Sequence, residues 1–147
     1  MTDGQTDGQT GPAPIAAPEE IRTKDGTTWT GRHIKRYTLP RTGAPPLNLR
    51  GMHVGHASTY TNQGGRWDDY RLYVTLGGRY VLYHEYKTQW QGESGHIEAI
   101  VGDSIPAILE SARGTIWTDY ERQQYPEVIN DLLDDADALD LVAETIE

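Results

Sequence analysis

Between residues 49 and 101, apolar and polar residues alternate in short runs that glycine-rich segments separate. A period of two is typical of strands that bury one face. The expected strands are residues 29–39, 49–61, 66–76, 79–89 and 96–101. The Pro-rich segment 40–48 is predicted to be a connector, and Gly77-Gly78 a two-residue hairpin turn.

After residue 103 the pattern changes to a helical one. We expect Asp103 to cap a short helix with Pro106 in its first turn, and a longer helix, interrupted at Pro126, to follow. The apolar residues that should pack this helix on the sheet are Val128, Leu132, Leu139, Val142 and Ile146, flanked by Ile129, Leu133 and Ala136. The predicted fold class is α+β, an antiparallel β-meander of about five strands with C-terminal α-helices packed on one face.

The N-terminal repeat TDGQTDGQTG is polar and rich in turn-forming residues. We expect residues 1–20 to be a disordered tail and residues 21–147 to form one domain, with the sheet over 27–101 and the helices over 103–147. The absence of cysteine excludes disulfides and thiolate metal sites. Because no run of about 18 apolar residues and no secretory signal occur, we expect no membrane contact and a cytoplasmic location.

Charge is distributed unevenly along the 147 residues, whose formal net charge is −9. Residues 21–50 contain seven Lys or Arg and one acid, whereas residues 119–147 contain ten acids and one Arg. The acidic segment indicates a solvated helix face, a surface for a basic protein partner, pairing with 21–50, or imitation of a nucleic-acid phosphate array. The candidate partner-binding residues are Asp131, Asp134, Asp135, Asp137 and Asp140.

The predicted hairpin turn places Leu76 opposite Arg79 and therefore Asp68 opposite Lys87. Asp68, Glu85 and Lys87 would then meet on one face of the sheet, as an ion pair at the edge of a core or as a catalytic group. The E-x-K at residues 85–87, with an acid on the neighbouring strand, resembles the catalytic pattern of restriction-type nucleases over about twenty residues. That resemblance implies two carboxylates that hold a divalent cation and a lysine that assists the attacking water.

Other ligand patterns do not predict a cofactor. His53 and His56 are three residues apart, so a strand would point them to opposite faces unless a bulge at Gly55 brings them together. Neither a Walker loop nor G-x-G-x-x-G occurs.

Aromatic residues are concentrated on the predicted hairpin: Trp67, Tyr70, Tyr73, Tyr80, Tyr83, Tyr86 and Trp90. They favour either core packing or an exposed recognition face, on which Tyr86 and Trp90 are candidate partner contacts. Together with the basic segment 21–50, such a face would suit single-stranded nucleic acid.

The leading hypothesis is a small non-catalytic binding or regulatory protein that acts through the acidic C-terminal helix and the aromatic hairpin. The alternatives are metal-dependent hydrolysis by Asp68, Glu85 and Lys87, and single-stranded nucleic-acid binding by residues 21–50. The sequence leaves the partner and the oligomeric state open.

Overall fold

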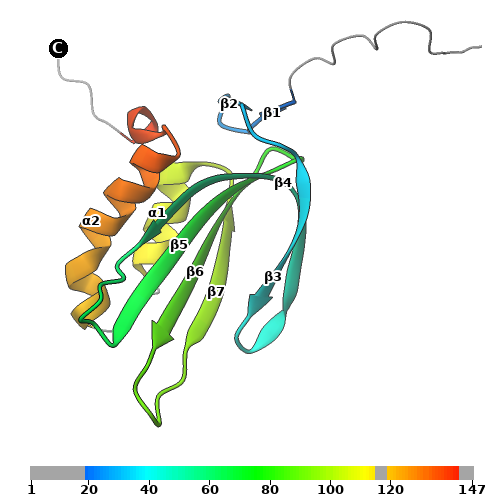
Figure 1. Ribbon diagram of the computed structural model, residues 1–147. Helices are drawn as coiled ribbons and strands as arrows, with labels where there is room; N and C mark the ends of the chain where they lie inside the picture. Colours follow the sequence, from blue (N-terminus) through cyan, green and yellow to red (C-terminus); the bar gives the residue numbers. More distant parts are fainter. Residues whose placement is uncertain (1–18, 115–118, 143–147) are drawn as a thin grey trace, which may run out of the picture.

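The computed structural model describes the backbone of residues 19–114 and 119–142, and their side chains except those of 119–123 (Figure 1). Five strands form one antiparallel sheet in sequence order. They are β3 (Lys35–Arg41), β4 (Ala44–Ser58), β5 (Arg66–Thr75), β6 (Tyr80–Thr88) and β7 (His96–Gly102). The other elements are β1 (Glu20–Arg22), β2 (Thr28–Thr30), α1 (Ile105–Arg113), α2 (Asp119–Asp135) and the 3-10 helix η1 (Leu139–Leu141). The α+β prediction is confirmed.

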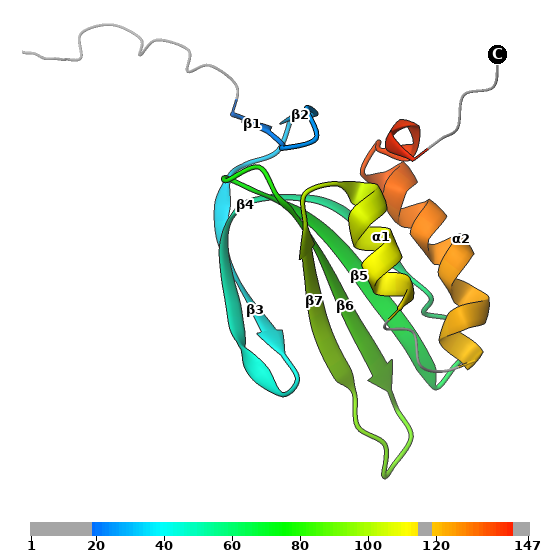
Figure 2. The ribbon, with the colours of Figure 1, turned by 180° about the vertical axis from the view of Figure 1, so that it is seen from behind.

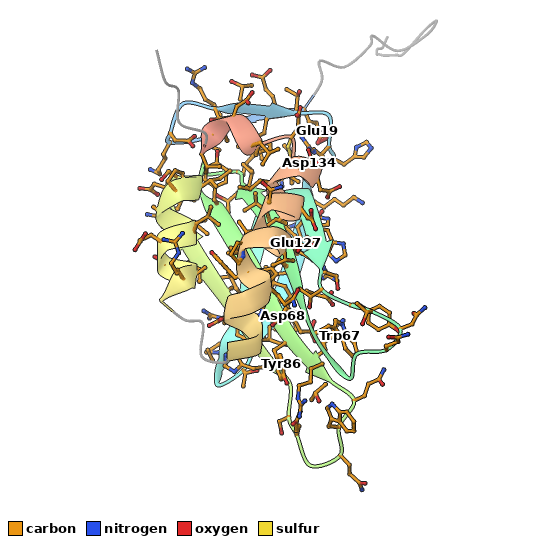
Figure 3. The ribbon with its side chains drawn as sticks, turned by 90° about the vertical axis from the view of Figure 1, so that its left-hand side faces the viewer. Glu19, Trp67, Asp68, Tyr86, Glu127 and Asp134 are labelled. Atoms are coloured by element: carbon orange, nitrogen blue, oxygen red, sulfur yellow. The ribbon has the colours of Figure 1, made fainter. Side chains whose placement is uncertain are left out.

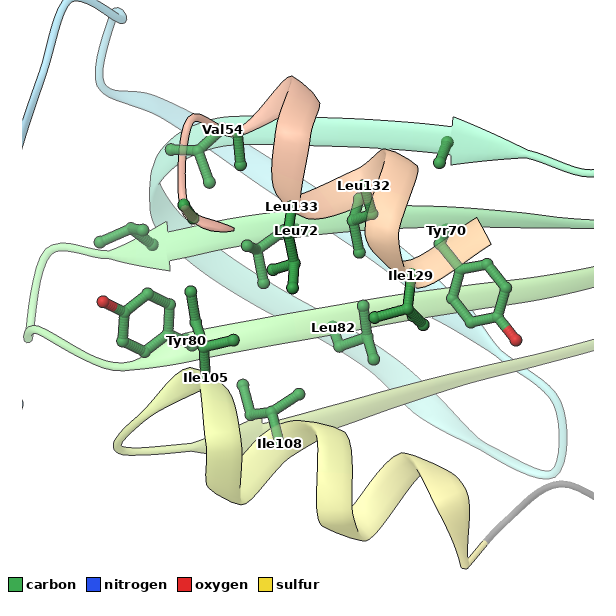
Figure 4. Packing of buried hydrophobic residues seen from close by; sticks show 14 of the residues in the cluster. Val54, Tyr70, Leu72, Tyr80, Leu82, Ile105, Ile108, Ile129, Leu132 and Leu133 are labelled. Atoms are coloured by element: carbon green, nitrogen blue, oxygen red, sulfur yellow. The ribbon is translucent and has the colours of Figure 1, made fainter. Parts of the chain in front are cut away.

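The sheet curves into a half-barrel whose convex face carries the two α-helices (Figures 1 and 2). Its two edges meet across the concave side, where the backbone N–H of Thr42 donates to the Ile97 carbonyl at 2.8 Å. A small apolar cluster lies on this concave side: Leu39, Tyr73, Val81 and Tyr83. The larger core lies between the helices and the convex face (Figure 4).

The apolar stripe of α2 forms one side of the larger core. Its buried residues include those predicted to pack on the sheet: Val128, Ile129, Leu132, Leu133 and Ala136. Burying one leucine-sized side chain contributes about 1.5–3 kcal/mol, so this stripe is sufficient to hold the helix on the sheet. Leu139 and Val142, by contrast, are each 36% exposed, and Ile146 lies outside the described residues.

The stripe stops because α2 ends in a Schellman motif. Asp137 takes φ 57°, and its N–H donates to the Asp134 carbonyl at 3.0 Å. The N–H of Ala138 donates to the Leu133 carbonyl at 2.7 Å. A left-handed residue at this position terminates a helix and redirects the chain. The predicted continuation of the packed stripe to Leu139 and Val142 is therefore wrong.

Two predicted helix features are also wrong. Ser104, rather than Asp103, caps α1, because its hydroxyl accepts from the N–H of Ala107 at 3.2 Å. The helix α2 continues through Pro126. Tyr125 and Val128, on either side of the proline, are buried in the core, and this packing holds the chain helical despite the missing N–H.

The first predicted strand and the connector after it differ from the structure in extent. Residues 29–39 are divided between β2 and β3 by a turn at Gly31, which takes φ 83°. Residues 40–48 are not a connector, because Thr42-Gly43 form a tight turn directly between β3 and β4. Pro40 is tolerated within β3 because that strand lies at the edge of the sheet.

Most of the predicted N-terminal tail, residues 1–18, lies outside the described residues. Glu20 already belongs to β1, and the Glu19 carboxylate accepts from the N–H of Ile34 at 2.6 Å. Within the described residues, no helix is both long enough and apolar enough to cross a membrane.

Candidate binding surfaces

The β5–β6 hairpin has a three-residue loop instead of the predicted two-residue turn. The N–H of Thr75 donates to the Arg79 carbonyl at 2.8 Å, which leaves residues 76–78 in the loop. Gly78 takes φ 86°, the left-handed conformation that a loop of this length requires. The register therefore differs by one residue from the prediction, and such a shift moves the side chains of one strand to the opposite face.

This shift separates the three candidate catalytic residues. Asp68 lies on the face covered by the helices and is 1% exposed (Figure 3). Glu85 and Lys87 lie on the concave side, because Glu85 pairs with Asp69 and Lys87 with Trp67. The predicted convergence is wrong, and the hydrolase hypothesis lacks the geometry on which it depended.

Lys87 pairs with carboxylates on its own side of the sheet. Its Nζ lies 2.8 Å from Oδ2 of Asp69 and 3.9 Å from Oε1 of Glu85. The hydrogen bond to Asp69 raises the pKa of Lys87. Burial acts to raise the pKa of Asp69, but the hydrogen bonds from Lys87 and Ser58 outweigh it and lower that pKa. This arrangement is a partly exposed ion pair.

A second charged group lies beneath the helices and was not predicted. His84 places Nε2 2.6 Å from Oδ1 of Asp68 and Nδ1 3.1 Å from Oε1 of Glu98. The Tyr70 ring stacks on the imidazole at a centroid distance of 4.4 Å. Burial alone would lower the pKa of His84, but the two carboxylates raise it to about 9. The imidazole is therefore protonated at neutral pH and donates on both sides.

An imidazolium with both nitrogens protonated has no lone pair for accepting a proton or binding a metal. In the described part of the chain, no group of three or more His, Asp or Glu is placed to hold a metal ion. Oδ2 of Asp68 is buried and has no hydrogen-bond partner among the described residues. We interpret Asp68, His84 and Glu98 as a structural network that joins β5, β6 and β7.

Sequence reasoning missed this network because the loop length decides which residues share a face. The ladder places Tyr70, His84 and Glu98 side by side on three strands. The local features that accompany the longer loop are Gly78 at its left-handed position and Thr75, whose hydroxyl accepts from the N–H of Arg79 at 3.0 Å.

The two histidines of β4 do share a face. The ladder pairs His53 with Tyr73 and Gly55 with Leu72, so a β-bulge adds one residue to β4. His53 packs on the Tyr73 ring at a centroid distance of 5.1 Å, and burial lowers the pKa of His53. The bulge fulfils the stated condition for a histidine pair, but it brings no further metal ligand from the described residues.

The acidic residues at the end of α2 have different surroundings. Asp135 is structural, because its Oδ2 accepts from the N–H of His56 at the β4 bulge at 2.8 Å. Asp137 and Asp140 line a hollow of about 270 Å³ beside Trp29 and Arg32. Arg32 itself bonds to the carbonyls of Val54 and Ala136 at 3.2 and 3.4 Å, and not to an aspartate.

The outer side of α2 carries the remaining acids. Glu127, Asp131 and Asp134 are exposed, and none forms an ion pair within the described residues. Glu127 and Asp131 line a hollow of about 190 Å³ between α2 and the end of β4, together with Ser58, Thr59, Tyr60, Thr61, Gln124 and Val128. We call Glu127, Asp131 and Asp134 the acidic face.

Most hairpin aromatics belong to the cores. Tyr70, Tyr73, Tyr80 and Tyr83 are each at most 5% exposed. Trp90 is 55% exposed and lies under the Arg66 guanidinium at 5.6 Å. Tyr86 is partly buried and lies, like Trp67, near the end of the sheet where β5 begins and β6 ends (Figure 3).

The outer side of the β3–β4 hairpin is basic. Arg36 pairs with Arg50 and Thr38 with Asn48 across the ladder, and all four residues are exposed. They line a hollow of about 480 Å³ together with Tyr37 and Leu49. We call Arg36, Thr38, Asn48 and Arg50 the basic face.

Comparison with protein families, with curated proteins and with solved structures found no match for this chain.

Proposed function

We propose that this protein is a non-catalytic binding protein that docks a basic protein partner on the acidic face of α2. The observation that carries the proposal is the contrast between the two sides of this helix. Its inner side packs on the sheet through Leu132 and its apolar neighbours, whereas Glu127, Asp131 and Asp134 are exposed and without ion pairs in the described residues.

The acidic face is unfavourable for the isolated helix. Glu127 and Asp131 are four residues apart, and like charges at this spacing destabilise a helix by about 0.2–0.5 kcal/mol. Asp131 and Asp134 lie near the C-terminus of α2, where negative charge opposes the helix dipole, and the last turn has no basic residue. A cationic partner would remove both penalties.

The hollow beside the acidic face suits a lysine or arginine side chain of the partner. The Glu127 and Asp131 carboxylates would receive the charged group, and an arginine fork would bind a carboxylate through two hydrogen bonds. Tyr60, which is 50% exposed on the same hollow, offers a ring face for a cation–π contact. Trp90 and Tyr86, at the C-terminal end of β6, remain candidate contacts of the partner.

The experiment compares two variants of equal net charge in capture of a basic partner from the source lysate. Glu127→Gln/Asp131→Asn/Asp134→Asn removes the acidic face. Glu20→Gln/Asp103→Asn/Glu110→Gln removes three exposed acids elsewhere, two of which form only surface ion pairs.

We expect the first variant to lose a basic protein that both the wild type and the second variant retain. Identical capture by all three proteins, or equal loss from both variants, would contradict docking at the acidic face. Thermal melts check that both variants stay folded.

A further inference from the structure

The cations of this protein fall into two groups according to their partners. Of the five Lys and Arg side chains described after residue 51, four form ion pairs with carboxylates: Arg66 with Glu93, Arg79 with Asp103, Lys87 with Asp69, and Arg113 with Glu110. The fifth, Arg71, lies over the Tyr83 ring at 6.0 Å. Among the described residues, none of the seven cations between residues 22 and 50 forms such a pair. Within the described residues, this segment therefore presents positive charge without a paired carboxylate.

This charge is concentrated at Arg36 and Arg50. The two residues are directly opposite in the β3–β4 ladder, and both are exposed. Like charges opposite each other in a sheet repel, so folding alone gives no reason for this pair.

The chemistry of the basic face is that of an anion site. Its hollow is lined by two guanidinium groups and the polar side chains of Thr38 and Asn48, and it contains no carboxylate. The Thr38 hydroxyl donates to the Asn48 amide oxygen at 2.9 Å, which leaves the Asn48 NH₂ available as a donor. Guanidinium groups bind phosphate oxygens through two parallel hydrogen bonds.

We propose that the basic face binds the phosphodiester backbone of single-stranded nucleic acid. The hollow is an open depression that runs along β3 and β4. Side chains on one face of a strand repeat every two residues, so the polar groups of the basic face form a row. A flexible chain of phosphates can follow such a row. A duplex is stiffer and follows a twisted hairpin less well. Tyr70, Tyr73, Tyr80 and Tyr83 are buried, and Tyr37 packs toward the concave cluster. The contact proposed at the basic face is therefore to backbone phosphates and not to stacked bases.

The two faces lie on opposite sides of the molecule. In both ribbon views, α2 and the β3–β4 hairpin lie on opposite sides of β5, β6 and β7 (Figures 1 and 2), so the acidic face does not cover the basic one. The net charge of −9 nevertheless repels a polyanion at long range, so binding is expected to be weak and strongly dependent on salt.

The experiment measures fluorescence anisotropy of a labelled oligothymidylate with the full-length protein at increasing salt. The test variant is Arg36→Gln/Arg50→Gln. The matched control is Arg79→Gln/Arg113→Gln, which removes two exposed arginines of equal charge from other surfaces. Each phosphate contact on a single strand contributes about −0.7 to the slope of log K against log salt, so the test variant should lose about 1.4 of that slope.

We expect the test variant to bind at least about tenfold more weakly at low salt, and the control to stay within about twofold of wild type. Equal weakening of both variants, or no binding by the wild type at low salt, would overturn the proposal. Polyglutamate as a competitor tests the ligand class: displacement of the oligonucleotide at equal charge would mean that the basic face recognises any polyanion, and would overturn it as well.

Thermal melts keep this result interpretable. Removing two repelling cations should leave the melting temperature unchanged or slightly higher. The acidic-face variant should still bind the oligonucleotide, so failure of one proposal does not imply failure of the other.

Discussion

Two adjacent aspartates on β5 belong to different charged groups, one buried and one partly exposed. Asp68 is buried with His84 and Glu98 under the helices, whereas Asp69 pairs with Lys87 on the concave side. Each group combines one cation with two carboxylates, but the side-chain exposure is 7% for His84 and 36% for Lys87. The difference shows how burial, rather than residue type, sets the energetic weight of an ion pair.

The largest expected contrast comes from removing the cation of each group. His84→Leu should lower the free energy of unfolding by about 3–5 kcal/mol, because it leaves Asp68 and Glu98 without their buried counter-charge. Lys87→Leu should lower it by about 1 kcal/mol or less, because water screens that pair. Urea denaturation of both variants measures the two values, and similar losses would contradict the assigned difference.

A pH series tests the same contrast without changing the core. The pKa of His84 is about 9 in the folded protein, above the ordinary value of 6.5 in the unfolded chain. A raised pKa contributes stability that is complete below pH 6.5 and is lost as the pH rises toward 9. The expected loss over this window is on the order of 2–3 kcal/mol.

Unfolding free energies at several pH values between 6.5 and 9 provide the measurement. In the His84→Leu variant the profile should become flat over this range. A wild-type profile that is already flat would show that the network does not hold the proton.

A smaller effect is expected from the loop that decides which aspartate is buried. Gly78→Ala should destabilise the protein by about 1–3 kcal/mol, because the residue has φ 86° and the new Cβ would lie 2.8 Å from the Arg22 carbonyl oxygen. Gly77→Ala is the matched control, since its Cβ would meet only the Thr75 hydroxyl, at 3.9 Å. Equal losses in the two variants would contradict the left-handed conformation and the close contact assigned to Gly78.

Local patterns were sufficient for β5, β6 and the packed side of α2. The alternation in residues 66–75 and 80–88, and the helical spacing from Val128 to Ala136, each follow from a periodicity that neighbouring residues carry. The charge asymmetry also follows from the sequence, because the acidic residues are concentrated in 119–147 and the basic residues in 21–50.

The candidate site was not predictable in the same way. Asp68, Glu85 and Lys87 were grouped through one assumed turn, and a loop one residue longer placed them on two faces. The pairing of Asp68 with His84 and Glu98 depends on two registers at once, and local residue preferences do not fix either.

The sequence by itself determined the fold class, the order of the strands and the separation of acidic and basic segments, because periodicity and charge are properties of short stretches. Only the tertiary structure decided which charges meet a partner and which face solvent. Asp135 and Asp131 are both acidic residues of α2, yet the first holds the β4 bulge and the second is exposed on the acidic face. The physical reason is that burial and pairing depend on contacts between residues far apart in the chain, which a local pattern does not contain.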